Sequence, residues 1–339
     1  MIQPAYSIVI ATYHGAEFMP GLFHSIHAQT VQPAEVVVID NSTTDAGACA
    51  AAIRQYYPEA KLFVQHENRD FCAGYNLGMQ KAQSEYIFIL NQDMVLEPRA
   101  AEELLSTLMT NERIGAVAPI VRRLTPDKEK TSIIDTVGIQ GTRARRFTNR
   151  GEGEEDRGQY VSATEPFGIS GAAMLFRKAA LTDVAQHGGG KPEEYFDEDF
   201  VAYKDDVDMS YRLRHRGWRI CIVPSAMIYH QRTAQETKIN QTRGIFTNRN
   251  HKSFRIRSYS LRNHWSVLIK NEPLSNIGVH APWIFWYELR KILFVLFFEW
   301  DTLKTIPSFI KYFPRMLAKR RAILSSSTIS AKQLRSWFA

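Results

Sequence analysis

The sequence predicts an α/β protein with a mixed, mostly parallel sheet flanked by helices, followed by a helical C-terminal extension. Short apolar runs rich in β-branched residues alternate with helical patterns over residues 1–120, which is typical of a sheet covered on both faces. The chain has 339 residues, 45% of them hydrophobic and 23% charged, and this suits one large α/β domain plus an appendage. Residues 251–339 combine aromatic and basic side chains at helical spacing.

The first 120 residues supply strands and helices in regular alternation. We expect strands where the runs SIVIAT, EVVVID, KLFVQ and YIFILN stand, at 7–12, 35–40, 61–65 and 86–91. Helical patterns lie between and after them, at 16–29, 45–57, 73–83 and 98–110. In such sheets ligands bind beyond the carboxyl ends of the strands, so the polar residues that end these runs are the first candidates for a site.

The middle of the chain is less regular. Residues 122–160 are rich in Arg, Gly and Glu and weakly patterned, so we expect a flexible excursion there. Order resumes with the apolar run 171–177 and a helix near 178–186. After a Gly-rich break come an acidic stretch, a helix over about 206–216 and a strand over 219–223.

Positive charge is concentrated at the C-terminal end. From residue 251 onward there are 15 Lys or Arg against 4 Asp or Glu, a net charge of +11, whereas the whole chain carries +7 and residues 1–250 therefore −4. The longest apolar run there, at 292–298, is far shorter than the roughly 20 residues of a spanning helix. The aromatic and basic side chains favour helices resting on an anionic membrane surface. The alternatives are ordinary packing against the preceding domain, and nucleic acid, for which no recognised motif is present.

The cysteines and the N-terminus bear on the compartment. Cys49, Cys72 and Cys221 are scattered, odd in number and form no CxxC pair, which indicates neither a disulfide framework nor a zinc site. We expect reduced thiols in a cytoplasmic compartment. The first residues enter a strand at once and show no basic leader, so we expect no targeting segment.

The stretch FDEDFVAYKDDVD, residues 196–208, is the most acidic part of the chain. Six acids precede or begin a helical segment: Asp197, Glu198, Asp199, Asp205, Asp206 and Asp208. Carboxylates at a helix N-terminus are favoured by the helix dipole, but capping needs only one or two of them. So dense a negative charge costs stability unless something uses it. A carboxylate here could take a proton from an acceptor hydroxyl, and Asp205 and Asp206 are the candidates.

Polar side chains end three of the expected strands. Asn91 and Asp93 follow the fourth strand, where a carboxylate can hold Mg²⁺ or Mn²⁺ against a diphosphate; the alternative is a loop carboxylate that caps the next helix. Asp40 ends the second strand and could accept hydrogen bonds from a nucleobase or ribose, the alternative being turn chemistry. Thr12 and Tyr13 end the first strand.

Two further places offer polar groups. In ENRDFCAGYNLG, residues 67–78, Asn68 and Asn76 supply amides beside two glycines, although the segment is neither a GxGxxG fingerprint nor a P-loop. His230 follows the last strand and its turn. It is a candidate metal ligand or diphosphate contact, the alternative being a partly buried surface histidine.

Together these segments resemble the family 2 glycosyltransferases with a GT-A fold, and most of all their rhamnosyltransferase-like branch. The match runs in unbroken order over about residues 5–235, through SIVIATYHG, VVVIDNSTTD, ENRDFCAGYNLGMQKA, YIFILNQDMVLEP, SGAAMLFRKAAL and FDEDFVAYKDDVDMSYRLRHRGWRI. The resemblance implies an inverting, metal-dependent transferase of a sugar, with rhamnose as first candidate. The donor would be a nucleotide-diphospho-sugar and the acceptor a glycan or a polyprenyl-diphosphate-linked glycan. It also implies a cytoplasmic protein, peripheral on the inner face of the cell membrane.

The resemblance implies a role for each candidate residue. The donor-binding residues would be Thr12, Tyr13, Asp40, Asn68, Asn76 and Asn91. Asp93 stands at the position of the family's metal-binding carboxylate, and His230 resembles the histidine that approaches the metal or the diphosphate. Asp206 falls at the catalytic base, with Asp205 as the first acid of the family's acidic pair.

The resemblance also implies a domain division, and the sequence differs from the family pattern at a few positions. It implies a catalytic domain over 1–240, with a nucleotide-binding half at about 1–120 and an acceptor half at about 160–235, and a helical extension over 241–339. Asp70 stands where the family often has Gly, and NQD replaces the commoner NPD or NDD, which leaves Asp93 as the anionic ligand there. The small-residue pair that usually follows the histidine is absent.

Two other functions remain alternatives. A sugar nucleotidyltransferase shares a nucleotide-binding α/β sheet but normally has a Gly-rich, basic N-terminal loop, whereas this chain reads ATYHGAEF. An inactive glycan-binding protein on the same fold is opposed by the presence of both Asp93 and Asp206.

Overall fold

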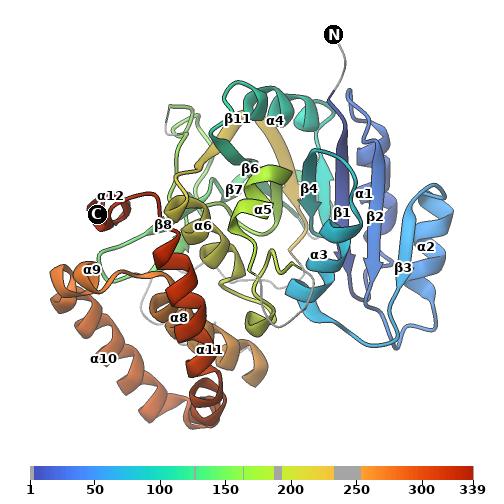
Figure 1. The fold of residues 1–339 in the computed structure, drawn as a ribbon. Helices are drawn as coiled ribbons and strands as arrows, with labels where there is room; N and C mark the ends of the chain where they lie inside the picture. Colours follow the sequence, from blue (N-terminus) through green and yellow to red (C-terminus); the bar gives the residue numbers. More distant parts are fainter. Residues whose placement is uncertain (1–3, 126, 163, 187–192, 233–252, 339) are drawn as a thin grey trace.

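The computed structural model describes residues 4–125, 127–162, 164–186, 193–232 and 253–338. At its centre is a nine-stranded mixed sheet with the order β3-β2-β1-β4-β10-β6-β11-β5, and β7 pairs with β6 outside this path. Helices flank the sheet, and the C-terminal helices gather beside α6, away from β1–β3 (Figure 1).

The first strands and helices form the parallel half of the sheet. Its strands are β1 (Tyr6–Thr12), β2 (Glu35–Asp40), β3 (Lys61–Val64) and β4 (Tyr86–Leu90), paired in parallel. The helices between and after them are α1 (Met19–His27), α2 (Ala48–Tyr56), α3 (Asp70–Lys81) and α4 (Ala100–Met109). The predicted strands and helices of this half are therefore confirmed, with ends shifted by a few residues.

In β1, β2 and β4 both faces are buried, which explains their continuous apolar runs, whereas the edge strand β3 is partly exposed. Successive side chains of a strand point to opposite faces. Val9 and Val37 accordingly belong to one hydrophobic cluster, whereas their neighbours Ile8 and Val36 belong to the other. Because neither face meets water, no polar alternation appears in the sequence.

The second half of the sheet contains antiparallel pairs. Its strands are β5 (Met94–Leu96), β6 (Ile114–Leu124), β7 (Lys130–Thr136), β10 (Ala173–Arg177) and β11 (Arg219–His230). Strand β10 pairs antiparallel with both β4 and β6, and β11 runs parallel to β6 but antiparallel to β5. The strand expected to end at residue 223 thus continues to His230.

Residues 122–160, expected to be a flexible excursion, contain regular strands instead. They hold the end of β6, all of β7, and a hairpin of β8 (Ile139–Gly141) and β9 (Phe147–Asn149). Several charges of this segment are paired within it: Arg122 lies 2.7 Å from Asp156, and Arg123 lies 3.3 Å from Glu152. Its polar composition therefore reflects ion pairs rather than a lack of structure.

The remaining helices surround the acidic stretch. They are α5 (Lys178–Val184), η1 (Glu198–Phe200), α6 (Asp205–His215), α8 (Phe254–Asn271), α9 (Leu274–Val279), α10 (Ala281–Phe298), η2 (Trp300–Thr305), α11 (Ile306–Ser325) and α12 (Ala331–Arg335). Helix α8 packs against α6 and α11. Leu334 and Phe338 return to the main hydrophobic core.

The structure bears differently on two expectations about the C-terminal extension. The division near residue 240 stays a prediction, because it falls outside the described residues. Among the parts of the chain that the structure describes, no helix has the length and apolar character needed to cross a membrane.

Candidate active site

A cavity of about 310 Å³ lies at the carboxyl ends of the parallel strands. Its lining consists of Ala11, Thr12, Tyr13, Asn41, Asn68, Asp70, Phe71, Asn91, Gln92 and Asp93. Five residues that sequence analysis assigned to a site are among them: Thr12, Tyr13, Asn68, Asn91 and Asp93. The strand ends that are separated in the chain therefore meet around one space, as the parallel topology requires.

Gln92 joins the ends of β1 and β4. Its Oε1 accepts hydrogen bonds from the Thr12 hydroxyl (2.6 Å) and from the Tyr13 amide (2.9 Å). A Cβ atom on Gly15 would come within 2.3 Å of the same oxygen, so glycine leaves room for this contact. Sequence analysis did not assign a role to Gln92, and its only signal was the departure from NPD or NDD.

Asp40 and Asn76 do not line the cavity. Asp40 is buried and accepts a hydrogen bond from the Ser42 amide (2.9 Å), which is the turn chemistry considered as its alternative. The Asn76 side chain is buried and forms two hydrogen bonds with the backbone of Phe196, each 2.8 Å long. Asn76 therefore ties α3 to the start of the acidic stretch.

The backbone conformation at Asp70 is one that favours glycine, the residue expected there from the family resemblance. Asp70 has a φ of 59°, in the left-handed region that favours glycine. The Asn68 side chain accepts a hydrogen bond from the Asp70 amide (2.8 Å) and supports this turn. Arg255 at the start of α8 forms an ion pair with the Asp70 carboxylate.

His230 lies between two carboxylates. Its Nε2 is 3.1 Å from Oδ2 of Asp93, and its Nδ1 is 2.8 Å from Oδ2 of Asp135. Burial favours the neutral imidazole, but the hydrogen bonds and charges of Asp135 and Asp93 outweigh burial and raise the pKa of His230 to about 9. Asp135, on β7, also pairs with Arg123 and Arg232. Sequence analysis missed Asp135, because it comes from a segment with no recognisable pattern.

The donor atoms beside the cavity fit a divalent cation only in part. Asp93 offers a carboxylate, and beside it His230 offers an imidazole that would have to release its proton before it binds a metal. The two would suit Mn²⁺ or Mg²⁺ when other oxygen atoms complete the shell. The described residues contain no group of three His, Cys, Asp or Glu side chains that could hold a metal. Diphosphate oxygens and water would have to supply the remaining ligands.

Asp205 and Asp206 begin α6 in an environment that opposes charge. Asp205 is buried, and burial together with the nearby charge of Asp206 raises its pKa to about 8. Asp206 is half-buried and accepts hydrogen bonds from the amides of Val207 (2.8 Å) and Gly171 (3.4 Å). Burial raises the pKa of Asp206, and the charge of Lys204 opposes this rise.

The structure brings the acidic pair to the same end of the sheet as Asp93. A Cβ atom on Gly171 would lie 3.4 Å from the ring of Phe71, which lines the cavity, and 3.6 Å from Oδ2 of Asp205. The next residue, Ala172, accepts the amide hydrogen bond of Asn91 (2.9 Å). Burial, and then the charges of Asp93 and Asp205, raise the pKa of the nearby Tyr75 phenol.

Sequence comparison identifies the family of this chain. Residues 7–183 match the model of the family described as glycosyl transferase family 2. The chain belongs to this family. It is 26% identical over 242 residues to N-acetylglucosaminyl-diphospho-decaprenol L-rhamnosyltransferase of Mycobacterium tuberculosis (strain H37Rv), covering 66% of this chain and 75% of that protein. It is 24% identical over 228 residues to poly-beta-1,6-N-acetyl-D-glucosamine synthase of Staphylococcus aureus (strain COL), covering 66% of this chain but only 49% of the synthase.

Solved structures agree with the glycosyltransferase fold. GalNAc-T7 in complex with UDP, GalNAc and Mn²⁺ has a TM-score of 0.57 at 14% identity, covering 79% of this chain and 48% of that one. S. aureus TarS 1–349 has a TM-score of 0.53 at 14% identity, covering 95% and 90%. These likenesses concern the fold, and the predicted GT-A architecture with a C-terminal helical region is confirmed.

Three other acids of the glycosyltransferase's acidic stretch, Asp197, Asp199 and Asp208, are paired with cations from the C-terminal helices. Lys270 of α8 lies 2.5 Å from Asp197 and 2.8 Å from Asp208, and all three are fully buried. Lys319 of α11 contacts Asp197 and lies 2.9 Å from Asp199. Part of the basic excess of residues 251–339 thus neutralises the acidic stretch, which is the packing considered as an alternative to a membrane.

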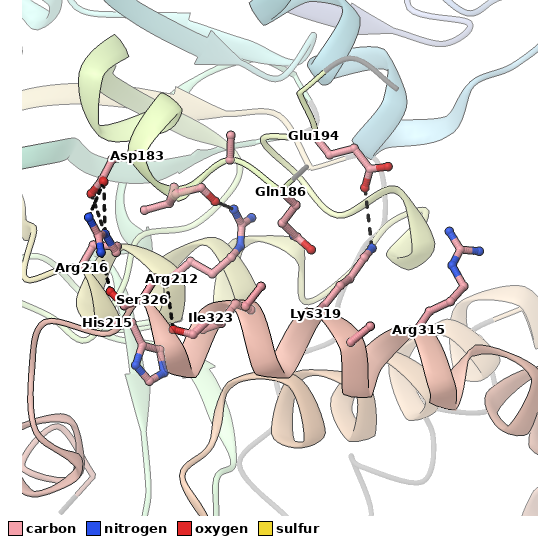
Figure 2. Close-up of a pocket in the computed structure, with 14 residues that line it drawn as sticks. Asp183, Gln186, Glu194, Arg212, His215, Arg216, Arg315, Lys319, Ile323 and Ser326 are labelled. Carbon is pink, nitrogen blue, oxygen red and sulfur yellow. Dashed lines mark hydrogen bonds and ion pairs between the residues drawn. The ribbon is translucent and has the colours of Figure 1, made fainter. Parts of the chain in front are cut away.

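A second cavity, of about 640 Å³, lies between α5, α6 and α11. Figure 2 shows two ion pairs among the charged side chains that line it. Arg216 lies 2.7 Å from Asp183, and Lys319 lies 3.7 Å from Glu194. No residue that the sequence analysis assigned to a site is in its lining, so the glycosyltransferase's candidate active site remains the cavity at the strand ends.

Proposed function

We propose that this glycosyltransferase is an inverting, divalent-metal-dependent enzyme that moves a sugar from a nucleotide-diphosphate donor to a lipid-linked glycan. Rhamnose is the first candidate for the sugar, and the acceptor would be a polyprenyl-diphosphate-linked glycan at the inner face of the membrane. The name of the M. tuberculosis relative, with its diphospho-decaprenol and L-rhamnose, supports this substrate class. The observation that carries the proposal is a carboxylate–histidine contact at Asp93, on a cavity whose lining residue Phe71 is separated from the acidic pair only by Gly171.

Asp93 and His230 would hold the cation. When bound, it would neutralise the charge that develops on the departing nucleoside diphosphate. The GalNAc-T7 structure, which contains Mn²⁺ and UDP on a similar fold, supports a divalent metal. Thr12, Tyr13 and Asn68, which also line the cavity, would contact the donor, and Gln92 fixes the loop after β1.

Asp206 would act as the general base. The acceptor hydroxyl would give its proton to Asp206 while its oxygen forms the new bond to the anomeric carbon. The bond from that carbon to the diphosphate oxygen breaks at the same time, and its electron pair leaves with the diphosphate. Asp205, with its pKa of about 8, would stay protonated at neutral pH. Asp206, whose charge is favoured by Lys204 and by the amides of Val207 and Gly171, would be the member of the pair that takes the proton.

The proposal is tested by donor binding and hydrolysis. UDP-, GDP- and dTDP-sugars are added with and without Mn²⁺, and the melting temperature and the release of nucleoside diphosphate are measured. We expect one donor to raise the melting temperature in the presence of Mn²⁺, because a ligand that binds the folded state stabilises it by mass action. Asp93→Asn should remove the metal-dependent part of this shift.

A matched control and two outcomes separate the alternatives. Glu59→Gln changes an exposed carboxylate just before the amino end of β3, whereas the cavity lies at the carboxyl ends of the strands. This variant should leave the metal-dependent shift unchanged. Release of pyrophosphate from a nucleoside triphosphate and a sugar phosphate would instead identify a nucleotidyltransferase. Glycan binding without any donor hydrolysis would identify an inactive binding protein.

A further inference from the structure

Helix α10 turns two of its three charged side chains, Glu288 and Lys291, toward the protein and most of its large apolar side chains toward solvent. Of its 18 residues only Val295 is buried. Glu288 accepts a hydrogen bond from the Trp265 indole (2.7 Å) and pairs with His264 (2.7 Å), both on α8. Lys291 pairs with the same carboxylate at 2.6 Å. This polarity is the reverse of that of a helix that covers a protein core.

The outward side of α10 is a continuous apolar face. We define it by its exposed large apolar residues and the tryptophan that follows them: Trp283, Phe285, Trp286, Ile292, Leu293, Leu296, Phe297, Phe298 and Trp300. Phe285, Phe297 and Trp300 are 66%, 70% and 71% exposed. Contiguous exposed apolar surface of this kind marks an interaction site rather than ordinary scatter.

The position of α10 leaves this face accessible in the described structure. The helix lies at the outer edge of the molecule, away from the sheet, and the neighbouring segments are α9 and η2 (Figure 1). At 1.5 Å per residue an 18-residue helix is about 27 Å long, and no described helix is apolar enough to span a membrane. A partner of the apolar face would therefore contact α10 along one side of the helix, and the helix would not cross a membrane.

Charge identifies the kind of surface. Arg290 within α10, Lys304 in η2 and Lys311 in α11 have exposed side chains, whereas Lys270 and Lys319 are paired with the acidic stretch. Such charge would repel a second copy of the same face but is attracted to anionic lipid headgroups. Trp283, Trp286 and Trp300 are the side chains that favour the boundary between headgroups and acyl chains.

We propose that the apolar face of α10 docks on an anionic phospholipid bilayer, with the helix lying in the plane of the interface and the flanking lysines and arginine on the headgroups. Apolar burial supplies the main attraction, and the basic residues select anionic over neutral lipid. This inference does not depend on the identity of the sugar donor or on the proposed chemistry.

Vesicle co-sedimentation of the full-length protein tests the proposal. Vesicles of phosphatidylglycerol with phosphatidylethanolamine are compared with vesicles of phosphatidylcholine alone. We expect binding to the anionic vesicles, a loss of binding at high salt, and a blue shift of tryptophan emission on binding. The double substitution Trp286→Ser, Phe297→Ser should weaken binding by at least about tenfold, because each side chain contributes apolar area to the bilayer.

Two matched variants keep the test specific. Met109→Ser with Val161→Ser changes two apolar residues that are 49% and 60% exposed outside the C-terminal helices, and should leave vesicle binding unchanged. Arg290→Gln with Lys304→Gln and Lys311→Gln should weaken binding by about fivefold per charge and reduce its salt dependence. Donor binding in solution should persist in every variant, which separates this inference from the proposed function and shows that the variants fold.

The inference is overturned if the Trp286→Ser, Phe297→Ser variant binds anionic vesicles as tightly as the parent protein. It is also overturned if sedimentation equilibrium without lipid shows a dimer that this substitution converts to monomers while vesicle binding is absent in both. In that case the apolar face of α10 is an interface between two copies of the chain.

Discussion

Two pairs of carboxylates in the acidic stretch have opposite environments. Asp197 and Asp208 contact the buried ammonium of Lys270; although burial opposes ionisation, the Lys270 charge outweighs it and lowers the pKa of both carboxyls. Asp205 and Asp206 lie between them in sequence, and burial raises the pKa of both. The partners of these acids therefore indicate their roles better than their number does. Contact with a buried cation makes Asp197 and Asp208 structural. Asp205 and Asp206 have fewer cations nearby, so they can hold or take a proton.

The C-terminal helices connect the two pairs. The backbone just before Asp205 is strained, because Val201, Tyr203 and Lys204 have φ values of 67°, 69° and 67°, and each such residue costs about 1–3 kcal/mol. The Asn263 side chain of α8 donates hydrogen bonds of 2.8 Å to the carbonyls of Phe200, Ala202 and Tyr203. The helix that neutralises the structural acids thus also holds the loop that places the acidic pair.

The largest expected effect is that of replacing Asp206, the proposed general base. Asp206→Asn should lower kcat by about 10²–10⁴-fold, because general-base catalysis is lost, while the donor dissociation constant stays within about twofold. Steady-state kinetics and donor titration measure the two quantities. Asp199→Asn, which changes a carboxylate paired with Arg315 (2.7 Å) and Lys319 (2.9 Å), should keep kcat within a few-fold. Near-normal turnover of Asp206→Asn would remove Asp206 from the role of base.

The next effect tests the structural pair. Lys270→Met leaves Asp197 and Asp208 buried beside each other without their shared ammonium, and should lower the free energy of unfolding by about 3–5 kcal/mol. Urea unfolding measures this loss. The control is Lys61→Met, which breaks a pair with Glu35 in which the lysine side chain is 46% exposed and should cost less than about 1 kcal/mol. Equal losses for the two variants would mean that the buried cluster is not special.

The smallest effect is the pH dependence of stability in Asp205→Asn. The pKa of Asp205 is raised from 3.8 to about 8 on folding, so between these values the folded protein keeps a proton that the unfolded chain has lost. In the parent protein this contribution to stability is full at low pH and is lost as the pH rises toward 8. Asparagine carries no such proton, so the stability of the variant relative to the parent should rise by roughly 2–3 kcal/mol between pH 5 and pH 7, at about 1.4 kcal/mol per pH unit.

Urea unfolding at several pH values measures this difference. The pKa values of Asp197 and Asp208 are lowered instead, so their contribution is present above pH 3.8 and is lost as the pH falls below it. Asp205→Asn should leave that acid-side loss in place. A pH-independent difference between the variant and the parent would contradict the assignment of the proton to Asp205.

Local sequence pattern predicted the parallel half of the fold and the strand-end position of Asp93, because apolar runs and the polar residues that end them are neighbours in the chain. It could not predict the partner of Asp197, since Lys270 is 73 positions away and no local pattern encodes such a contact. Asp135 and the strands within 122–160 were missed for a related reason: their charges look solvated until the ion pairs of the folded state are known.

The hydrogen bonds of Gln92 couple the position of the loop after β1 to the position of Asp93. The amide side chain holds Thr12 and Tyr13, and the next residue in the chain carries the carboxylate that meets His230. Whatever shifts the loop on nucleoside entry also shifts the place where a cation would sit. By thermodynamic reciprocity each ligand then alters the affinity for the other by the same factor, so nucleotide and ion are expected to load as a cooperative pair.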